Sequence, residues 1–463
     1  MWWLYGLYGL YILAGGGLAV ASMRGMRKHQ QERWQAFQDT VKLCGLRMVS
    51  ISKPRATRLK LEAEAGPVTL RVEDIRDKKR EYGIQVVVSF PGPPGFAGVR
   101  IRPEKYRPAG VREIEIGDER FDSTFYVEGP SRLVSVLLDA ETRRLLVRLS
   151  AEGPLTIAGG EASVKTSDQG VATLLPLLLD LARRLSVNVD VAQRLAENAR
   201  QDSVAGVRLH NLLVLVREFP NDPETVETLR AACSDPSPQV RLRAGMLLLG
   251  TEGRSTLAEV AESLEDDAIS AQAVAHLGRD LPFDRTCALL TQALRRRHLQ
   301  TVRACLEALG QSGDEGAVDA LAKVLAIEQG ELAAAAALAL GATASPAAEP
   351  PLLEALRRSE KGDLQIAAAQ ALGRAGTAAA VLPLKDAAEE GTGDLRRAAR
   401  QAIAEIQSRL QGASPGQLSI AGADAGQLSL AHDEAGQLSL AADPAGQLSL
   451  DTGRDAGGTA GPR

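Results

Sequence analysis

The sequence predicts a multidomain protein built from one N-terminal transmembrane helix, an α+β domain, an all-α helical solenoid and a disordered C-terminal tail. Three observations lead to this prediction. Residues 1–23 contain no charged side chain, the dipeptide Leu-Gly recurs at nearly constant spacing between residues 249 and 373, and residues 413–463 are dominated by small and polar residues. The composition, 45% hydrophobic and 24% charged, is typical of a chain that folds over most of its length.

The uncharged run at residues 1–23 is long enough to cross a bilayer as a helix. Tryptophan and tyrosine crowd its first half, as is typical of a membrane interface. Basic residues outnumber acidic ones from Arg24 to Lys60, so the positive-inside rule leaves the body of the chain in the cytoplasm. Arg far outnumbers Lys, a bias that favours a bacterial source. We therefore expect a single-pass anchor at 1–23 in the bacterial inner membrane and a basic juxtamembrane segment at 24–41.

A cleaved signal peptide is the alternative interpretation of the same run. The tripeptide Ala19-Val20-Ala21 resembles a signal-peptidase site, which predicts a mature chain starting near Ser22 and an exported envelope binding protein. The run lacks a charged segment before its apolar part, and the basic cluster follows it instead of preceding it. Both features favour the anchor.

Between residues 42 and 170, short runs of alternating apolar and polar residues predict an α+β domain. Pro91–Phe96 is typical of a turn, and apolar residues at helical spacing predict one helix over Ser131–Ser150. No family is indicated by these residues, and two connecting helices are expected at 171–203. The expected strands are Leu46–Ile51, Arg58–Glu62, Val68–Val72, Ile84–Phe90, Val99–Ile101, Val111–Ile116, Phe121–Val127, Leu155–Ala158 and Ala162–Lys165.

Sequence signatures of catalysis are missing from the chain. It contains no Gly-rich phosphate loop, no G-x-S-x-G elbow and no HExxH pair. The four cysteines form no CxxC pair and have no histidine at ligand spacing, which favours small core residues over a metal site. We therefore expect no enzyme activity, no cofactor and no metal. The formal net charge of −4 predicts no general attraction to nucleic acid.

Residues 204–412 repeat a pattern of helix, short turn and helix. Leu-Gly closes an alanine-rich second helix five times, at spacings of 28, 32, 31 and 32 residues. The glycine is expected just past the helix end, where a left-handed residue ends many helices. One repeat after Leu372-Gly373, the corresponding dipeptide is Ile403-Ala404, and the absence of glycine there indicates a terminal cap. The five dipeptides are Leu249-Gly250, Leu277-Gly278, Leu309-Gly310, Leu340-Gly341 and Leu372-Gly373.

Second helices such as TVRACLEALG (301–310) and LQIAAAQALG (364–373) resemble HEAT-like repeats of the phycobilin-lyase type. The resemblance covers about 204–410 and implies a stacked helical solenoid that acts as an interaction scaffold. It leaves one alternative open, a chromophore-handling or lyase-like enzyme. His210 and His276 lie on apolar helix faces, a pattern that favours structural histidines over a catalytic base.

The tail, residues 413–463, holds four decapeptides with the core QLS(L/I) and too little apolar surface to offset chain entropy. The repeats indicate DNA-level duplication or a multivalent linear motif, whose linkage raises avidity. QLSL resembles the motif by which bacterial replication proteins bind the sliding clamp, but it lacks the bulky residue that should follow. Each copy is also a potential strand for a partner's sheet edge.

The expected function is that of a membrane-tethered, non-catalytic scaffold that binds an unidentified protein through its solenoid. A basic run at the end of one first helix is the best candidate for partner binding, because charge often lines the binding surface of a solenoid. The glutamines of the tail repeats are the second candidate. The candidate residues are Arg295, Arg296, Arg297, Arg303, Gln417, Gln427, Gln437 and Gln447.

Overall fold

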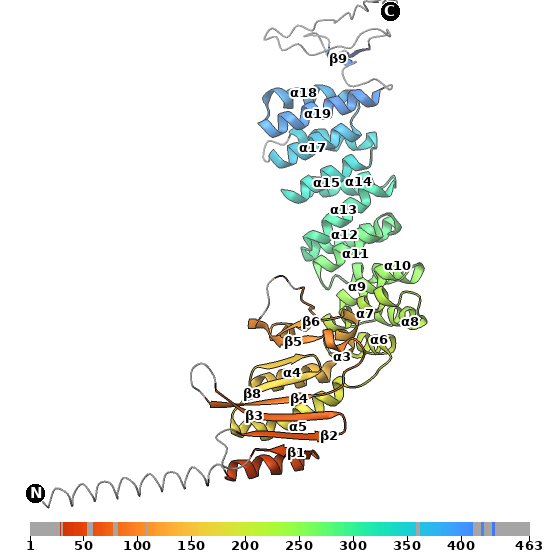
Figure 1. The fold of residues 1–463 in the computed structure, drawn as a ribbon. Helices are drawn as coiled ribbons and strands as arrows, with labels where there is room; N and C mark the ends of the chain where they lie inside the picture. The colour runs from red at the N-terminus through yellow and green to blue at the C-terminus, as the bar shows by residue number, and fades with distance from the viewer. Residues whose placement is uncertain are drawn as a thin grey trace, which may run out of the picture. The chain divides into compact units, whose positions relative to one another are not determined.

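The computed structural model of the chain contains two compact units, with the boundary between Ala244 and Gly245 in the sequence. The expected succession of an α+β domain and an all-helical repeat region is confirmed (Figure 1). The structure describes residues 28, 31–52, 59–76, 82–106, 110, 112–357, 362–410, 418–420 and 428–430.

The first unit contains an antiparallel sheet of eight strands in the order β1-β2-β3-β4-β8-β7-β5-β6. In β2 one face is buried and the other is solvated: Leu61 and Ala63 are buried, whereas Lys60 is exposed. All residues of β6 are buried, so both faces of the sheet are covered there. The strands are β1 (Arg47–Ile51), β2 (Lys60–Ala65), β3 (Val68–Arg76), β4 (Tyr82–Ser89), β5 (Arg100–Pro103), β6 (Phe125–Glu128), β7 (Leu155–Ala158) and β8 (Glu161–Thr166).

Helices cover the buried face of this sheet. Figure 1 shows α4 (Ala140–Glu152) and α5 (Asp168–Leu185) against the strands. The leucines of α5 belong to the sheet's core, together with Trp34 from a helix at residues 31–43. Arg33 of that helix forms ion pairs with Asp74 of β3 and Asp168 of α5. The core therefore extends into the segments expected as juxtamembrane (24–41) and connecting (171–203), because both contribute apolar faces that only the sheet can bury.

Three local predictions for the α+β domain are wrong. Residues 112–116 form no strand, although the Ile114 N–H donates to the Val127 carbonyl of β6. The expected strand Phe121–Val127 begins instead as helix α2 (Glu119–Asp122) before β6. The single helix expected at Ser131–Ser150 is divided into α3 (Ser131–Leu137) and α4, because the Asp139 side chain accepts the Thr142 N–H and starts a new helix.

Buried ion pairs join this domain to the helices that follow it in the first unit. The Arg143 guanidinium donates to both carboxylate oxygens of Asp202, at 2.9 Å each, and to Asp118 at 2.9 Å. Arg208 pairs in the same forked way with Asp235, at 2.7 Å. The helices involved are α6 (Val191–Gln201), α7 (Ala205–Glu218), α8 (Pro223–Ala232) and α9 (Pro238–Leu247).

The backbone of the α+β domain also contacts the backbone of α7, at Gly117 and Gly206. A Cβ added to Gly117 would lie 2.5 Å from the backbone carbon of Gly206 in α7, a separation that no real side chain tolerates. Glycine at both positions therefore lets the loop before α2 lie directly on the first turn of α7.

The second unit is a stack of helix pairs (Figure 1). Each first helix packs on a second helix, and each second helix packs on the next one along the chain. The first helices are α10 (Thr251–Ser263), α12 (Phe283–Arg296), α14 (Ala317–Ile327), α16 (Glu349–Arg357) and α18 (Val381–Glu390). The second helices are α11 (Asp267–Leu277), α13 (Leu299–Ser312), α15 (Glu331–Ala342), α17 (Gly362–Ala375) and α19 (Gly393–Arg409).

Two predictions concern the ends of the chain. The expected anchor at 1–23 lies outside the described residues, and within those residues we find no helix long and apolar enough to cross a membrane. In the tail, the described fragments β9 (Leu418–Ile420) and β10 (Leu428–Leu430) pair antiparallel, so the cores of the first two repeats adopt strands.

His210 is the most strongly perturbed histidine of the described chain. Its Nε2 lies 2.8 Å from Oγ of Ser135, and burial, with a smaller effect of Arg217, lowers its pKa to about 4. The contact with Ser135 fits the structural role that was expected for His210. His276, in contrast, is exposed on α11.

We predict that the first unit loses stability as the pH falls from about 6.5 to about 4. An unfolded histidine takes up a proton near pH 6.5, whereas folded His210 does so only near pH 4, so protons favour the unfolded state between these values. The loss should reach up to about 3 kcal/mol. Urea unfolding at several pH values, followed by fluorescence of the buried Trp34, measures it. His210→Gln should remove this part of the pH dependence, and an unchanged profile in that variant would contradict the assignment.

Candidate functional site

The glycines of the Leu-Gly dipeptides serve two different purposes. Gly250 and Gly278 have positive φ angles, of 96° and 49°, at helix boundaries, in line with the expectation. Gly310, Gly341 and Gly373 instead lie inside α13, α15 and α17, so the expectation that they end their helices is wrong. Their backbones are helical, and the reason for glycine is packing rather than φ.

These three glycines let successive second helices touch through their backbones. A Cβ on Gly310 would lie 2.7 Å from the Ala339 carbonyl oxygen of α15, and one on Gly341 would lie 2.6 Å from Cα of Ala371 in α17. A separation under 3.0 Å is a clash with atoms that cannot rotate away. At the equivalent phase of α19, Ala404 is exposed, which agrees with its expected position at the end of the stack.

Close packing of the second helices leaves the first helices apart. Whereas α13 and α15 are in extensive contact, α12 and α14 scarcely touch. A groove of about 620 Å³ separates α12 from α14. Its walls are one stripe from each helix at spacings of three and four residues, so each stripe is a single helix face. The lining residues are Phe283, Cys287, Leu290, Thr291, Leu294 and Arg295 of α12, with Gly316, Asp319, Ala320, Lys323, Val324, Ile327 and Glu328 from α14 and its start.

The groove is apolar at its base and charged at its rim. Leu290 and Val324 are buried at the base, whereas Ile327 is 76% exposed at the rim, so the apolar lining continues from the base to the rim. Burial, with Asp284 and Asp314 nearby, raises the pKa of the Cys287 thiol, so this residue lines the groove as a neutral group.

The cations of the groove lie toward the C-terminal ends of both helices. Arg295 and Lys323 are exposed and have no hydrogen-bond or ion-pair partner within the described chain, whereas Glu328 pairs with Arg297 at 3.9 Å. Asp319 lies one turn before Lys323. An apolar ligand with an acidic group near the C-terminal ends would therefore match this surface.

The structure separates the residues predicted for partner binding. Arg295 lines the groove, but Arg296 donates to the carbonyl oxygens of Ser263 and Leu264, at 3.3 and 3.1 Å, and so links two repeats. Arg297 ends α12 in the left-handed region, with φ of 61°. Arg303 forms an ion pair with Glu331 of the next second helix. Gln417, Gln427, Gln437 and Gln447 lie outside the described residues.

Sequence reasoning missed the apolar part of the groove. Phe283 and Ile327 lie on first helices whose apolar stripes were assigned to the core as a whole. The sequence did contain a signal for the groove, because the apolar stripe of α14 extends to Ile327, the last residue of that helix.

Comparison with known families finds HEAT repeats at residues 325–404 and a PBS lyase HEAT-like repeat at residues 302–326. HEAT repeats are thus present at 302–404, within the predicted span of 204–412, and α14 with its half of the groove lies in this part. No curated protein was found to match the chain.

Two solved structures are similar over about half of the chain. One is human deoxyhypusine hydroxylase in complex with glycerol, with 16% identity, coverage of 47% of this chain and 96% of that chain, and a TM-score of 0.22. The other is an engineered protein, with 19% identity, coverage of 47% and 89%, and a TM-score of 0.23.

We predict that Gly310→Ala destabilises the second unit by about 1–3 kcal/mol, because the new methyl group forces α13 and α15 apart. Alanine is intrinsically a better helix former than glycine, so helix propensity alone predicts that Gly310→Ala stabilises the unit. Thermal unfolding followed by far-ultraviolet circular dichroism measures the change. Gly393→Ala is the matched control, because a Cβ added at Gly393 has no atom within 4 Å. The stability of this variant should equal that of the unmodified chain or be slightly higher. Equal unfolding midpoints for both variants would refute the packing role.

Proposed function

We propose that the chain is a non-catalytic interaction scaffold that binds a partner protein in the groove between α12 and α14. The observation that carries the proposal is the groove itself, which has Leu290 and Val324 buried at its base and Ile327 exposed at its rim. Exposed apolar surface of this kind is typical of interaction sites. The HEAT repeats at 302–404 support the same conclusion, because stacked helical repeats commonly provide extended binding surfaces.

The partner segment that fits this groove is an amphipathic helix. Two parallel stripes of side chains leave a trough into which a third helix can place residues at i, i+3, i+4 and i+7. Leu294 and Ile327 would contact its apolar face. An acidic residue of the partner would pair with Arg295 or Lys323, which lack a carboxylate partner within the described chain.

The scaffold is proposed to be tethered to the cytoplasmic side of a bacterial inner membrane. Residues 1–23 support this as an uncharged, aromatic-rich run followed by basic residues. The tail repeats would recruit a second protein, and the strand pairing of Leu418–Ile420 with Leu428–Leu430 favours recognition as added strands over recognition as single residues.

A displayed library of helical peptides, selected against the full-length chain, tests the groove. Selected peptides should carry an apolar stripe and an acidic residue, and Ile327→Asp should weaken their binding by at least about tenfold. Ile327 is so exposed that this change should leave the fold intact, which circular dichroism checks. Arg295→Glu should weaken the same peptides, and a peptide with its acidic residue changed to Lys should recover binding to that variant.

Leu382→Asp is the control. Like Ile327, Leu382 is an exposed aliphatic residue of a first helix, 57% accessible, but it lies in α18 and does not line the groove. It should bind the selected peptides as well as the unmodified chain does. Peptides that bind all three variants equally, or a selection without enriched peptides, would exclude the groove as the binding site.

The tether predicts that the full-length chain, tagged at its C-terminus, stays in membranes through alkaline carbonate. Protease should reach the tag only from the cytoplasmic side of oriented vesicles, and deletion of residues 1–23 should release the chain. A mature protein that begins near Ser22, or a tag on the outer side, would show that the segment is a signal peptide instead.

A further inference from the structure

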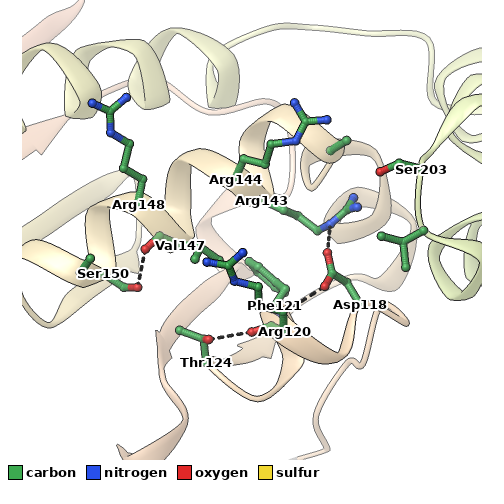
Figure 2. Close-up of a pocket in the computed structure, with 13 residues that line it drawn as sticks. Asp118, Arg120, Phe121, Thr124, Arg143, Arg144, Val147, Arg148, Ser150 and Ser203 are labelled. Carbon is green, nitrogen blue, oxygen red and sulfur yellow. Dashed lines mark hydrogen bonds and ion pairs between the residues drawn. The ribbon is translucent and has the colours of Figure 1, made fainter.

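A second pocket lies in the first unit, on the surface formed by α2, α4 and the start of α7. Its volume is about 740 Å³, within the range of small-molecule sites. Figure 2 shows that arginine side chains dominate its lining. Four arginines from two helices contribute: Arg120 from α2, and Arg143, Arg144 and Arg148 from α4.

One of the four arginines is structural. Arg143 is 3% exposed and is held by Asp202, by Asp118 and by the Leu138 carbonyl oxygen, at 2.9 Å each. The carboxylate of Asp118 is thereby engaged at the base of the pocket, where it also accepts the Phe121 N–H. Arg143 and its two aspartates thus form a buried, rigid floor with one net negative charge, because two carboxylates face a single guanidinium group.

The other three arginines form an excess of positive charge around that floor. Arg144 and Arg148 are one helical turn apart and project to the same side of α4 (Figure 2), a like-charge pair that disfavours the empty site. Arg144 has one carboxylate partner, Glu141. Arg120 and Arg148 are exposed and have no hydrogen-bond or ion-pair partner for their guanidinium groups within the described chain.

The remaining lining indicates what the arginines would bind. Ser203, exposed at the start of α7, offers a hydroxyl group, and Val147 and Ala151 offer a small apolar wall. Planar guanidinium forks match the oxygens of a phosphate group and bind them in pairs. A lone ion would leave most of the pocket volume empty, whereas a phosphate on a small organic body would fill it.

We propose that this pocket binds the phosphate group of a phosphomonoester, held by Arg120, Arg144 and Arg148. The chemistry is shared by a free phosphorylated metabolite and by the headgroup of a phosphatidic-acid-like lipid. Five acidic residues line a separate hollow on the other flank of α2, which directs an anion to the arginine side. These residues are Glu104, Glu113, Glu115, Glu119 and Asp122.

Calorimetric titration of the full-length chain with glycerol 1-phosphate and with dihexanoyl phosphatidic acid, kept below its micelle concentration, tests the proposal. Both probes carry a phosphomonoester, and only the second carries acyl chains. Comparable binding of both identifies a free phosphorylated ligand, and binding at least about tenfold tighter for the second identifies a lipid headgroup. Binding should weaken as salt is added.

The double variant with Arg120→Ala and Arg148→Ala should weaken binding of the preferred probe by at least about tenfold. Arg148→Lys should give an intermediate affinity, because the charge remains but the planar fork is lost. Arg132→Ala, on exposed α3 surface outside the pocket, should bind like the unmodified chain, and Trp34 fluorescence verifies that all variants are folded. Failure of the unmodified chain to bind either probe, or equal affinity in the double variant, would overturn the assignment.

Discussion

Backbone contact between successive second helices is the constraint on which the repeat region depends. Gly310, Gly341 and Gly373 place no side chain between one helix and the next, so the second helices form a tight layer of small residues. The first helices pack less closely on one another, as α12 and α14 show. The groove lies between α12 and α14, which scarcely touch, and side chains of both helices form its apolar base.

Arginine has two distinct uses in this protein, and the difference is whether a carboxylate faces it. Arg143 and Arg208 are buried, and each is matched by a forked aspartate, since an unmatched buried charge would destabilise the fold. The Arg143 pair joins α4 to the end of α6, and the Arg208 pair joins α7 to the loop after α8. Arg120, Arg148 and Arg295 are exposed and unmatched within the described chain, and each lines a hollow. The unmatched arginines thus mark surfaces, whereas the matched ones specify how helices join.

The two surfaces differ in chemistry and lie in different units. The groove presents aliphatic side chains and suits a helix of another protein, whereas the pocket presents exposed guanidinium groups around the buried Arg143 and suits an anion. A scaffold with both could bind a protein partner in one unit and a phosphorylated ligand in the other. The residues whose substitution tests each surface are exposed, so the variants should keep the fold.

The sequence by itself determined what is periodic or local: the alternation of β2 and β3, the positions of β7 and β8, and the helix pairs with their spacing of about 31 residues. Tertiary structure decided everything that depends on a distant neighbour. Residues 112–116 alternate like a strand yet form none. Gly310, Gly341 and Gly373 lie inside helices, because the next second helix occupies the space of a side chain there. Within one basic run, only Arg295 faces the groove, because Arg296 and Arg297 meet carbonyl and carboxylate groups of neighbouring repeats. Periodicity shows which face of a helix is apolar, but only the packed neighbours determine how much of that face remains open.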